Sequence, residues 1–226
     1  MTGTLRHTAL LVVFPLAAAA TVAATAVATA VATAVATAAV AQAPRPQPPL
    51  GAFVAQRVTV MPAQLLRADT GSLVVPSTWA QFRRELDDSI GAAIAERGVN
   101  RKWAYAADVA RAAKRNAAYV SDPYSLGAQQ LRGATITLGE RIPDVFASNL
   151  RPHIAIGDTR FALIPIDLKF VRAGADQRAV LRLVLVDGRA ATFVWEGEVT
   201  SDPVRARTPA LAGSLAARIA DLVIAP

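Results

Sequence analysis

Hydrophobic residues recur at intervals of three and four along residues 79–94, which is the spacing of one face of an α-helix. This face consists of Trp79, Phe82, Leu86, Ile90 and Ile94. Thr78 and Gln81 form a capping-box pattern before it, and Gly98 marks its end, so we expect an amphipathic helix here. The opposite face carries Arg83, Arg84, Asp87, Asp88, Glu96 and Arg97. We interpret that face as solvated.

Three strands are predicted in the last third of the chain, over residues 161–172, 178–187 and 191–201, with a turn at Asp187-Gly188. Side chains alternate between the two faces of the second strand. One face carries Val180, Arg182, Val184 and Val186, and the other carries Leu181, Leu183 and Leu185. Because both faces are mostly apolar, we expect this strand to be central in its sheet.

Weaker patterns complete the expected fold. Residues 57–66 predict a first strand, in which Pro62 indicates an edge position or a bulge. Residues 108–115 predict a second helix, residues 126–150 are ambiguous, and residues 209–224 predict a terminal helix. The apolar side of the terminal helix consists of Leu211, Leu215, Ile219, Leu222 and Val223. Separate blocks of helices and antiparallel strands predict an α+β fold, a single antiparallel-rich sheet with amphipathic helices packed on it.

The first 41 residues differ from the rest, since 29 of them are hydrophobic and Arg6 is their one charged residue. A weakly basic start, an apolar stretch over 8–40 and the small residues Ala39-Val40-Ala41 form the pattern of a secretory signal peptide. We predict a signal peptide over 1–41 with cleavage after Ala41. The apolar stretch is also long enough to span a bilayer, so an inner-membrane anchor with residues 8–40 as its span is the alternative.

Proline content sets the next boundary. Residues 42–56 begin with four prolines, Pro44, Pro46, Pro48 and Pro49, which favour an extended linker. No comparable break and no internal repeat follow. We therefore expect a signal peptide (1–41), a Pro-rich linker (42–56) and one α+β domain (57–226).

Charge and composition narrow the function classes. The 24 Lys and Arg exceed the 17 Asp and Glu, and the net charge of +7 falls to +6 without Arg6. These charges are scattered, which indicates a solvated surface, and an exported chain is not expected to bind nucleic acid. The chain has no cysteine and two histidines, so we expect no disulfide, no lipid-anchoring cysteine, no metal site and no cofactor.

The last strands carry a hairpin motif. Residues 182–187 are Arg-Leu-Val-Leu-Val-Asp, and Trp195-Glu196-Gly197 follows the turn. With the order of the predicted elements over residues 57–225, this motif resembles a group of bacterial envelope proteins. The group comprises the CsgG-like curli secretion channel family, the outer-membrane activators of penicillin-binding proteins, and the amino-terminal domain of the translocation protein TolB. The resemblance implies a periplasmic or outer-membrane-associated adaptor domain without an active site. Gly188-Arg189 stands where that group has Thr-Gly.

Catalytic motifs are missing from the sequence, including the nucleophile elbow, the P-loop, the H-E-x-x-H pattern and the dinucleotide glycine fingerprint. A Ser-His-Asp triad would have to use His153, with Asp158 of the Gly157-Asp158-Thr159 turn as its neighbour, and no serine is nominated. We interpret His153 as a strand-end residue near an Arg151-Pro152 turn. We therefore name no catalytic, cofactor-binding or metal-binding residue.

Two pairs of carboxylates and a group of aromatic residues are further candidate sites. Asp87 and Asp88 point about 100° apart on a helix, so they do not converge easily. Glu196 and Glu198 share a strand face, which we interpret as the wet side of the sheet. The aromatic residues are Trp103, Tyr105, Tyr119 and Tyr124. Core packing is favoured for them over a surface platform for a glycan or a partner, and Asp122-Pro123-Tyr124 predicts a capped turn.

The sequence thus predicts an exported bacterial envelope protein, periplasmic or envelope-associated, that acts as a non-catalytic interaction or assembly module. Its expected partner is another envelope protein, and membrane contact is expected only through an uncleaved signal segment. The alternatives are an envelope hydrolase with an unusual site near His153, and an inner-membrane-anchored periplasmic domain.

Overall fold

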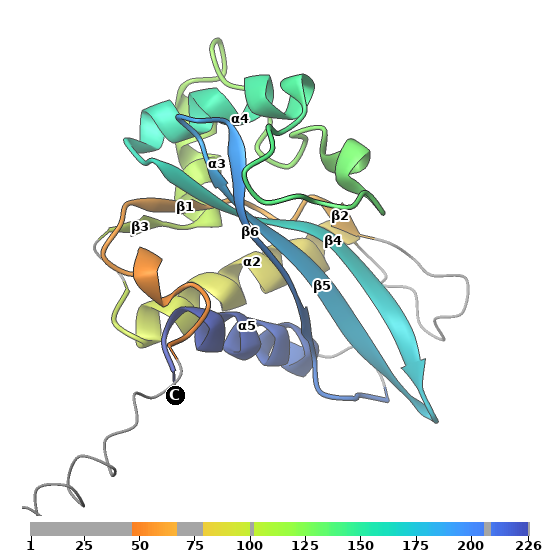
Figure 1. Ribbon diagram of the computed structural model, residues 1–226. Coiled ribbons are helices and arrows are strands. Elements are labelled where there is room, and N and C mark those ends of the chain that lie inside the picture. The colour runs from red at the N-terminus through yellow and green to blue at the C-terminus, as the bar shows by residue number, and fades with distance from the viewer. Residues whose placement is uncertain (1–46, 67–78, 100–101, 206–208, 226) are drawn as a thin grey trace, which may run out of the picture. The chain divides into compact units, whose positions relative to one another are not determined.

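The computed structural model describes residues 47–66, 79–99, 102–205 and 209–225. Within them, six strands form one mixed sheet (Figure 1). The strands are β1 (Val58–Val60), β2 (Leu65–Leu66), β3 (Trp103–Ala104), β4 (Phe161–Ala173), β5 (Asp176–Asp187) and β6 (Thr192–Thr200). The helices are η1 (Gly51–Phe53), α2 (Trp79–Glu96), α3 (Ala106–Arg115), η2 (Ala128–Leu131), α4 (Asp144–Gly157) and α5 (Pro209–Val223). The predicted signal peptide and Thr78 of the predicted capping box lie outside the described residues.

The sheet has the strand order β3-β1-β4-β5-β6, and β2 pairs with β4 beyond β1. β1 runs parallel to both of its neighbours, whereas β4, β5 and β6 form an antiparallel meander. The predicted α+β fold is confirmed. The three meander strands lie within two residues of their predicted bounds, and β5 is central as expected.

Helices cover both faces of the sheet (Figure 1). On one face α2 and α5 pack against Leu163, Leu168, Leu181 and Leu183. On the other face, α3, α4 and η2 pack against Ala162, Ile164, Val184 and Val186. The alternation of side chains along the central strands therefore supplies two separate hydrophobic cores.

The first strand differs from its prediction at Pro62. The chain leaves strand conformation over residues 61–64, although Met61 N–H and Gln64 N–H still donate to the carbonyl oxygens of Leu163 and Pro165. Pro62 lacks the N–H that would continue the ladder. Of the two predicted alternatives, an edge position or a bulge, the edge does not hold for β1, which β3 covers at Val58 and Thr59, whereas the strand is interrupted around Pro62.

The apolar face of α2 is confirmed, with Phe82, Leu86, Ile90 and Ile94 buried. The prediction that the opposite face is solvated is wrong at Asp87, which is 5% exposed. Its carboxylate reaches the backbone of the 61–64 segment and accepts the Ala63 N–H at 2.9 Å. Arg83 and Arg97 are partly buried, while Arg84, Asp88 and Glu96 are exposed.

The ambiguous region forms η2 and then α4, which places His153 inside a helix. The strand-end interpretation of His153 is therefore wrong. Pro152 lies within α4, but Phe146, Leu150 and Ile154 are buried at spacings of four, and this packing maintains the helix despite the missing N–H. Asp158, with φ 47, ends the helix in the left-handed conformation, as the turn there requires.

A register shift in β4 between Pro165 and Asp167 changes which side chains face which core. Before it, Leu163 belongs to the α2 and α5 core, and after it Leu168 and Phe170 do so. An added residue in one strand inverts the alternation that follows it. Asp167 and Lys169 consequently lie on the other face, beyond the end of the second core.

The turn between β5 and β6 is built around Asp187. Its Oδ1 accepts the N–H groups of Arg189 and Ala190, and its Oδ2 accepts the Arg160 guanidinium at 2.7 and 2.9 Å. Burial by itself would raise the pKa of Asp187, but these donors together hold the pKa below its usual value. Asp187 of the predicted turn thus also holds the start of β4, through Arg160.

Residues 47–225 of the described chain belong to one compact unit. At its start, Leu50 is buried and its N–H donates to the Leu222 carbonyl at 2.8 Å, so the chain enters the unit beside the end of α5. None of the described helices combines the length and the apolar composition needed to cross a bilayer.

Candidate functional site

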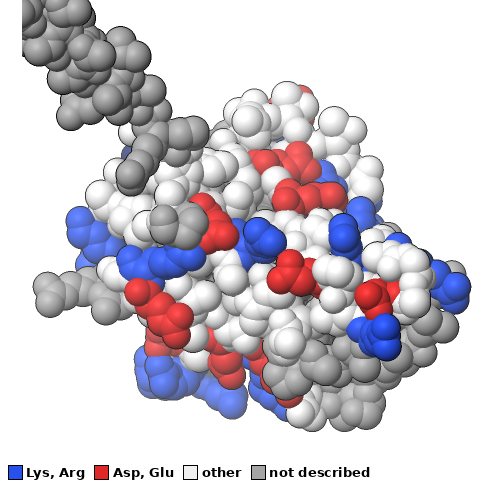
Figure 2. Space-filling view, turned by 90° about the horizontal axis from the view of Figure 1, so that it is seen from below, with Lys and Arg blue, Asp and Glu red and all other residues white. Residues whose placement is uncertain are grey.

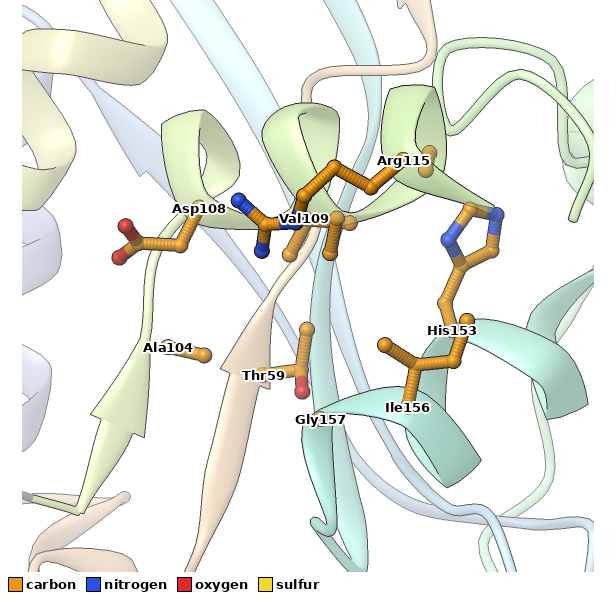
Figure 3. A pocket seen from close by; sticks show the side chains of 10 residues that line it. Thr59, Ala104, Asp108, Val109, Arg115, His153, Ile156 and Gly157 are labelled. Atoms are coloured by element: carbon orange, nitrogen blue, oxygen red, sulfur yellow. The ribbon is translucent and has the colours of Figure 1, made fainter. Parts of the chain in front are cut away.

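A cavity of about 180 Å³ lies beside His153 (Figure 3). Helix α3 forms its roof with Val109, strands β1 and β3 form its floor with Thr59 and Ala104, and Ile156 of α4 stands at its side. The wall is mostly apolar, and Asp108 and Arg115 lie at its rim on α3. Helix α3, which the sequence predicts, and helix α4, which it does not, thus form one concave site with the parallel strands β1 and β3.

His153 is 4% exposed, and its Nε2 has no hydrogen-bond partner among the described residues. Burial lowers the pKa of this imidazole, and the charge of Asp122 opposes that effect only in part. A neutral imidazole carries one donor and one acceptor nitrogen. His153 is therefore a buried polar group whose hydrogen-bonding capacity the described protein does not use, which is uncommon.

A catalytic triad is not assembled around His153 within the described chain. The cavity hydroxyl of Thr59 is paired with Thr159 Oγ1 at 2.7 Å, and the Asp158 carboxylate forms an ion pair with Arg57. A triad requires a hydroxyl and a carboxylate on opposite sides of the imidazole. Asp158, the predicted neighbour of His153, thus pairs with Arg57, the residue before β1, instead.

A second cluster surrounds Asp87. Burial raises the pKa of Asp87 to about 7, against the lowering effects of the Ala63 N–H, Arg83 and Tyr124. The Tyr124 hydroxyl faces the carboxyl group without completing a hydrogen bond to Oδ2, and the Arg83 guanidinium lies 5.4 Å from the centre of the Tyr124 ring. A carboxyl group with such a pKa changes protonation near neutral pH.

Gln64 connects this cluster to the loop before η2. Its Nε2 donates to the carbonyl oxygens of Pro62 and Pro123, and its Oε1 accepts the Leu126 N–H at 3.0 Å. Asp122 Oδ1 accepts the Tyr124 N–H at 3.0 Å, which is the capped turn that the sequence predicts. Asp87 and Gln64 thus hold the loop carrying Tyr124 against α2.

A third site is an open groove of about 540 Å³ on the sheet, which we call the open-face groove. Its charged residues are Asp167, Lys169, Arg182, Glu196 and Glu198, and residues 133–136 form its remaining wall. Glu196 and Glu198 share one strand face as predicted, and both have cationic partners across the sheet.

Arg182 organises the open-face groove. Its Nε donates to Glu196 Oε1 at 2.6 Å, and its Nη1 and Nη2 donate to the carbonyl oxygens of Leu131 and Ala134 at 3.1 and 2.8 Å. The side chain is 14% exposed. Arg182 therefore fixes the loop after η2 to the sheet through charge-assisted hydrogen bonds.

The four aromatic residues of the middle region, Trp103, Tyr105, Tyr119 and Tyr124, differ in how deeply they are buried. Trp103 is buried in β3 and donates from Nε1 to the Phe53 carbonyl, whereas Tyr119 is 85% exposed. Tyr105 and Tyr124 are partly buried, and the Tyr105 hydroxyl donates to the Val99 carbonyl. Core packing is correct for Trp103 and wrong for Tyr119.

Charges are interspersed on the face that α2 and α5 form (Figure 2). On the described part of that face, basic and acidic side chains alternate without a broad region of one sign. The described residues contain no group of three or more His, Asp or Glu side chains placed to hold a metal ion.

Sequence reasoning missed the roles of Asp87, Arg182 and Thr59. Arg182 carried a usable signal, because a charged residue in a strand with two apolar faces requires buried partners. Asp87 directly follows Leu86 of the buried face, so it lies at the edge of the apolar face of α2. Thr59 carried no signal, since its partner Thr159 is distant in the sequence.

The chain matches no family model and no curated protein. Among solved structures, a PelC dodecamer from Paraburkholderia phytofirmans covers 75% of this chain and 87% of its own, with 10% identity and a TM-score of 0.37. Lipoprotein GNA1162 from Neisseria meningitidis covers 73% and 94%, with 17% identity and a TM-score of 0.37. The hypothetical protein CT253 from Chlamydia trachomatis covers 65% and 72%, with 13% identity and a TM-score of 0.30. These are bacterial proteins, and a similarity of this size carries no conclusion about the function of this chain. Their names are not those of the envelope protein families that residues 182–197 resemble.

Proposed function

We propose that this chain is an exported bacterial envelope protein whose folded unit is a non-catalytic interaction module. Export is supported by the order of residues 1–41, with Arg6, the apolar stretch and Ala39-Val40-Ala41. The partner is another envelope protein, and it binds at the open-face groove. The observation that carries this proposal is an open groove on the sheet that is lined by charged side chains.

The groove favours a basic segment of the partner. Its accessible carboxylates are Glu196 and Glu198, because Asp167 is 5% exposed, and the Arg182 cation is already held by Glu196 and two carbonyl oxygens. The Lys169 and Glu198 pair is long, at 3.5 Å, and both side chains are partly exposed. Such surface pairs are weak, so an incoming Lys or Arg can replace Lys169 as the partner of Glu198.

Reversing the charge at Glu198 is expected to abolish partner binding. The Glu198→Lys protein should no longer retain the envelope protein that the wild type captures after crosslinking in envelope extract, because like charges then meet in the groove. Glu96→Lys makes the same change at an exposed position of α2 and should retain the partner. Equal capture by Glu198→Lys and the wild type, with both proteins folded, would exclude the groove as the interface.

Signal cleavage is expected after Ala41. The mass of the chain recovered from the envelope should then correspond to residues 42–226, without the apolar stretch. Intact-mass spectrometry checks this directly. A recovered chain that still contains residues 8–40 would instead establish the anchored alternative.

The hydrolase alternative rests on His153 and its cavity. Within the described chain Thr59 is engaged by Thr159 and Asp158 by Arg57, so the geometry supports the interaction module better. An envelope hydrolase activity that is lost in His153→Ala, with the fold retained, would reverse this preference.

A further inference from the structure

We propose that the cavity beneath α3 binds a small monocarboxylate with a compact apolar body, such as an aromatic acid of one ring. This site is separate from the open-face groove, and the proposal is independent of the interaction function. It follows from the size of the cavity, from the buried polar group in its wall and from the cation at its rim.

The cavity volume suits a ring-sized body. At about 180 Å³, it is slightly larger than an engineered cavity of about 150 Å³ that holds benzene. Its apolar lining comes from Ala104, Val109, Ala112, Ala113 and Ile156. A ligand with six or seven carbon atoms would remove this surface from water.

His153 supplies the polar anchor inside the cavity. Its ring stands at the end of the cavity between α3 and α4, with Nδ1 on the cavity side and Nε2 turned away from it (Figure 3). The side chain is almost completely buried, and Nε2 has no partner among the described residues, so a ligand in the cavity would meet Nδ1. Burial lowers the pKa of the imidazole, which favours the neutral form of the ring. A neutral ring hydrogen bonds to a ligand without placing a charge in an apolar wall.

Arg115 supplies the charge at the rim. Among the described residues it forms no ion pair, and in Figure 3 its guanidinium extends along α3 over the cavity. The neighbouring carboxylate of Asp108 is occupied, because it accepts from Arg111 and from the Tyr105 N–H. An arginine with free donors at an exposed rim matches a carboxylate that remains near water while the ring is buried.

Benzoate is the probe for this site, and the imidazole resonance of His153 is the readout. The chain has two histidines, and His153→Gln assigns the resonance of His153. In NMR titrations of the full chain, we expect a saturable shift of this resonance with benzoate. Benzyl alcohol, which has a similar ring and no charge, should bind at least fivefold more weakly.

Two variants locate the ligand. Arg115→Gln should weaken benzoate binding at least fivefold, whereas Lys114→Gln, the neighbouring cation on α3 outside this cavity, should change it less than twofold. Ala112→Phe fills the cavity and should abolish the shift of the His153 resonance with benzoate. Because Arg115 is exposed, its substitution is not expected to disturb folding, so Arg115→Gln tests the site even where Ala112→Phe does not fold.

Three outcomes would overturn the proposal. The first is no shift of the His153 resonance at any soluble benzoate concentration. The second is equal binding of benzoate and benzyl alcohol, which would exclude the carboxylate. The third is an equal loss of affinity in Arg115→Gln and Lys114→Gln, which would mean that general positive charge, and not this rim, attracts the anion.

Discussion

The Asp87→Asn protein is expected to gain stability relative to the wild type as the pH rises. Between about pH 5.5 and about pH 8, the difference in unfolding free energy between variant and wild type should shift by about 2 kcal/mol in favour of the variant. Burial raises the pKa of Asp87 from 3.8 to about 7. The folded state therefore binds more protons than the unfolded state in this window, and stability falls as the pH rises through it. Asparagine keeps an oxygen for the Ala63 N–H and carries no charge to bury.

Urea unfolding at the two pH values measures this effect. Asp88→Asn is the matched control, because Asp88 is the next residue of α2 and is exposed. Its unfolding free energy should follow the wild type with pH. A constant difference between Asp87→Asn and the wild type across the range would mean that Asp87 is ionised in the folded protein throughout.

The Arg182→Met protein is expected to be less stable than the wild type by about 3 kcal/mol. Methionine retains part of the aliphatic stem and removes the guanidinium. Glu196 then loses its cation, and the carbonyl oxygens of Leu131 and Ala134 lose their donors. Because these bonds fix the loop after η2, amide hydrogen exchange over residues 131–136 should become faster.

Arg178→Met is the control on the same strand, since Arg178 is exposed, and it should change stability by less than about 0.5 kcal/mol. Adding Glu196→Gln to Arg182→Met should recover about 1 kcal/mol, because it removes the carboxylate left without a cation. Equal stabilities of the Arg178 and Arg182 variants would show that the network contributes nothing to the fold.

The two substitutions bear differently on the proposed interaction. Arg182 lies in the open-face groove and shapes its wall, so Arg182→Met should also weaken partner binding. Asp87 lies on α2 and contacts the 61–64 segment, outside the groove. A partner lost equally in Asp87→Asn and Arg182→Met would therefore place the interface elsewhere.

Local patterns were sufficient for most of the secondary structure. The 3.6-residue period of α2, the alternation in β5 and the apolar side of α5 each reflect a face that packs against a core, so the sequence predicts them directly. The α+β class follows from their order. The burial of β5 on both faces also followed, because alternate apolar residues leave no face for water.

The candidate sites were less accessible to sequence reasoning, for reasons visible at particular residues. His153 follows Pro152, which favoured a turn, but long-range packing of Phe146 and Leu150 maintains α4 through the proline. The cavity beside it joins residues from β1, β3, α3 and α4, and no local pattern records that proximity.

The sequence by itself determined the apolar amino-terminal segment, the α+β class, the central strand and the absence of cysteine chemistry, because each depends on composition or on short periodic patterns. Only the tertiary structure decided that β1 lies inside the sheet, that the β4 register shift places Asp167 and Lys169 in a groove, and that Asp87 and His153 are buried. These features depend on contacts between segments far apart in the chain. Burial, which sets the pKa values of Asp87 and His153, is a property of those contacts and not of the local sequence.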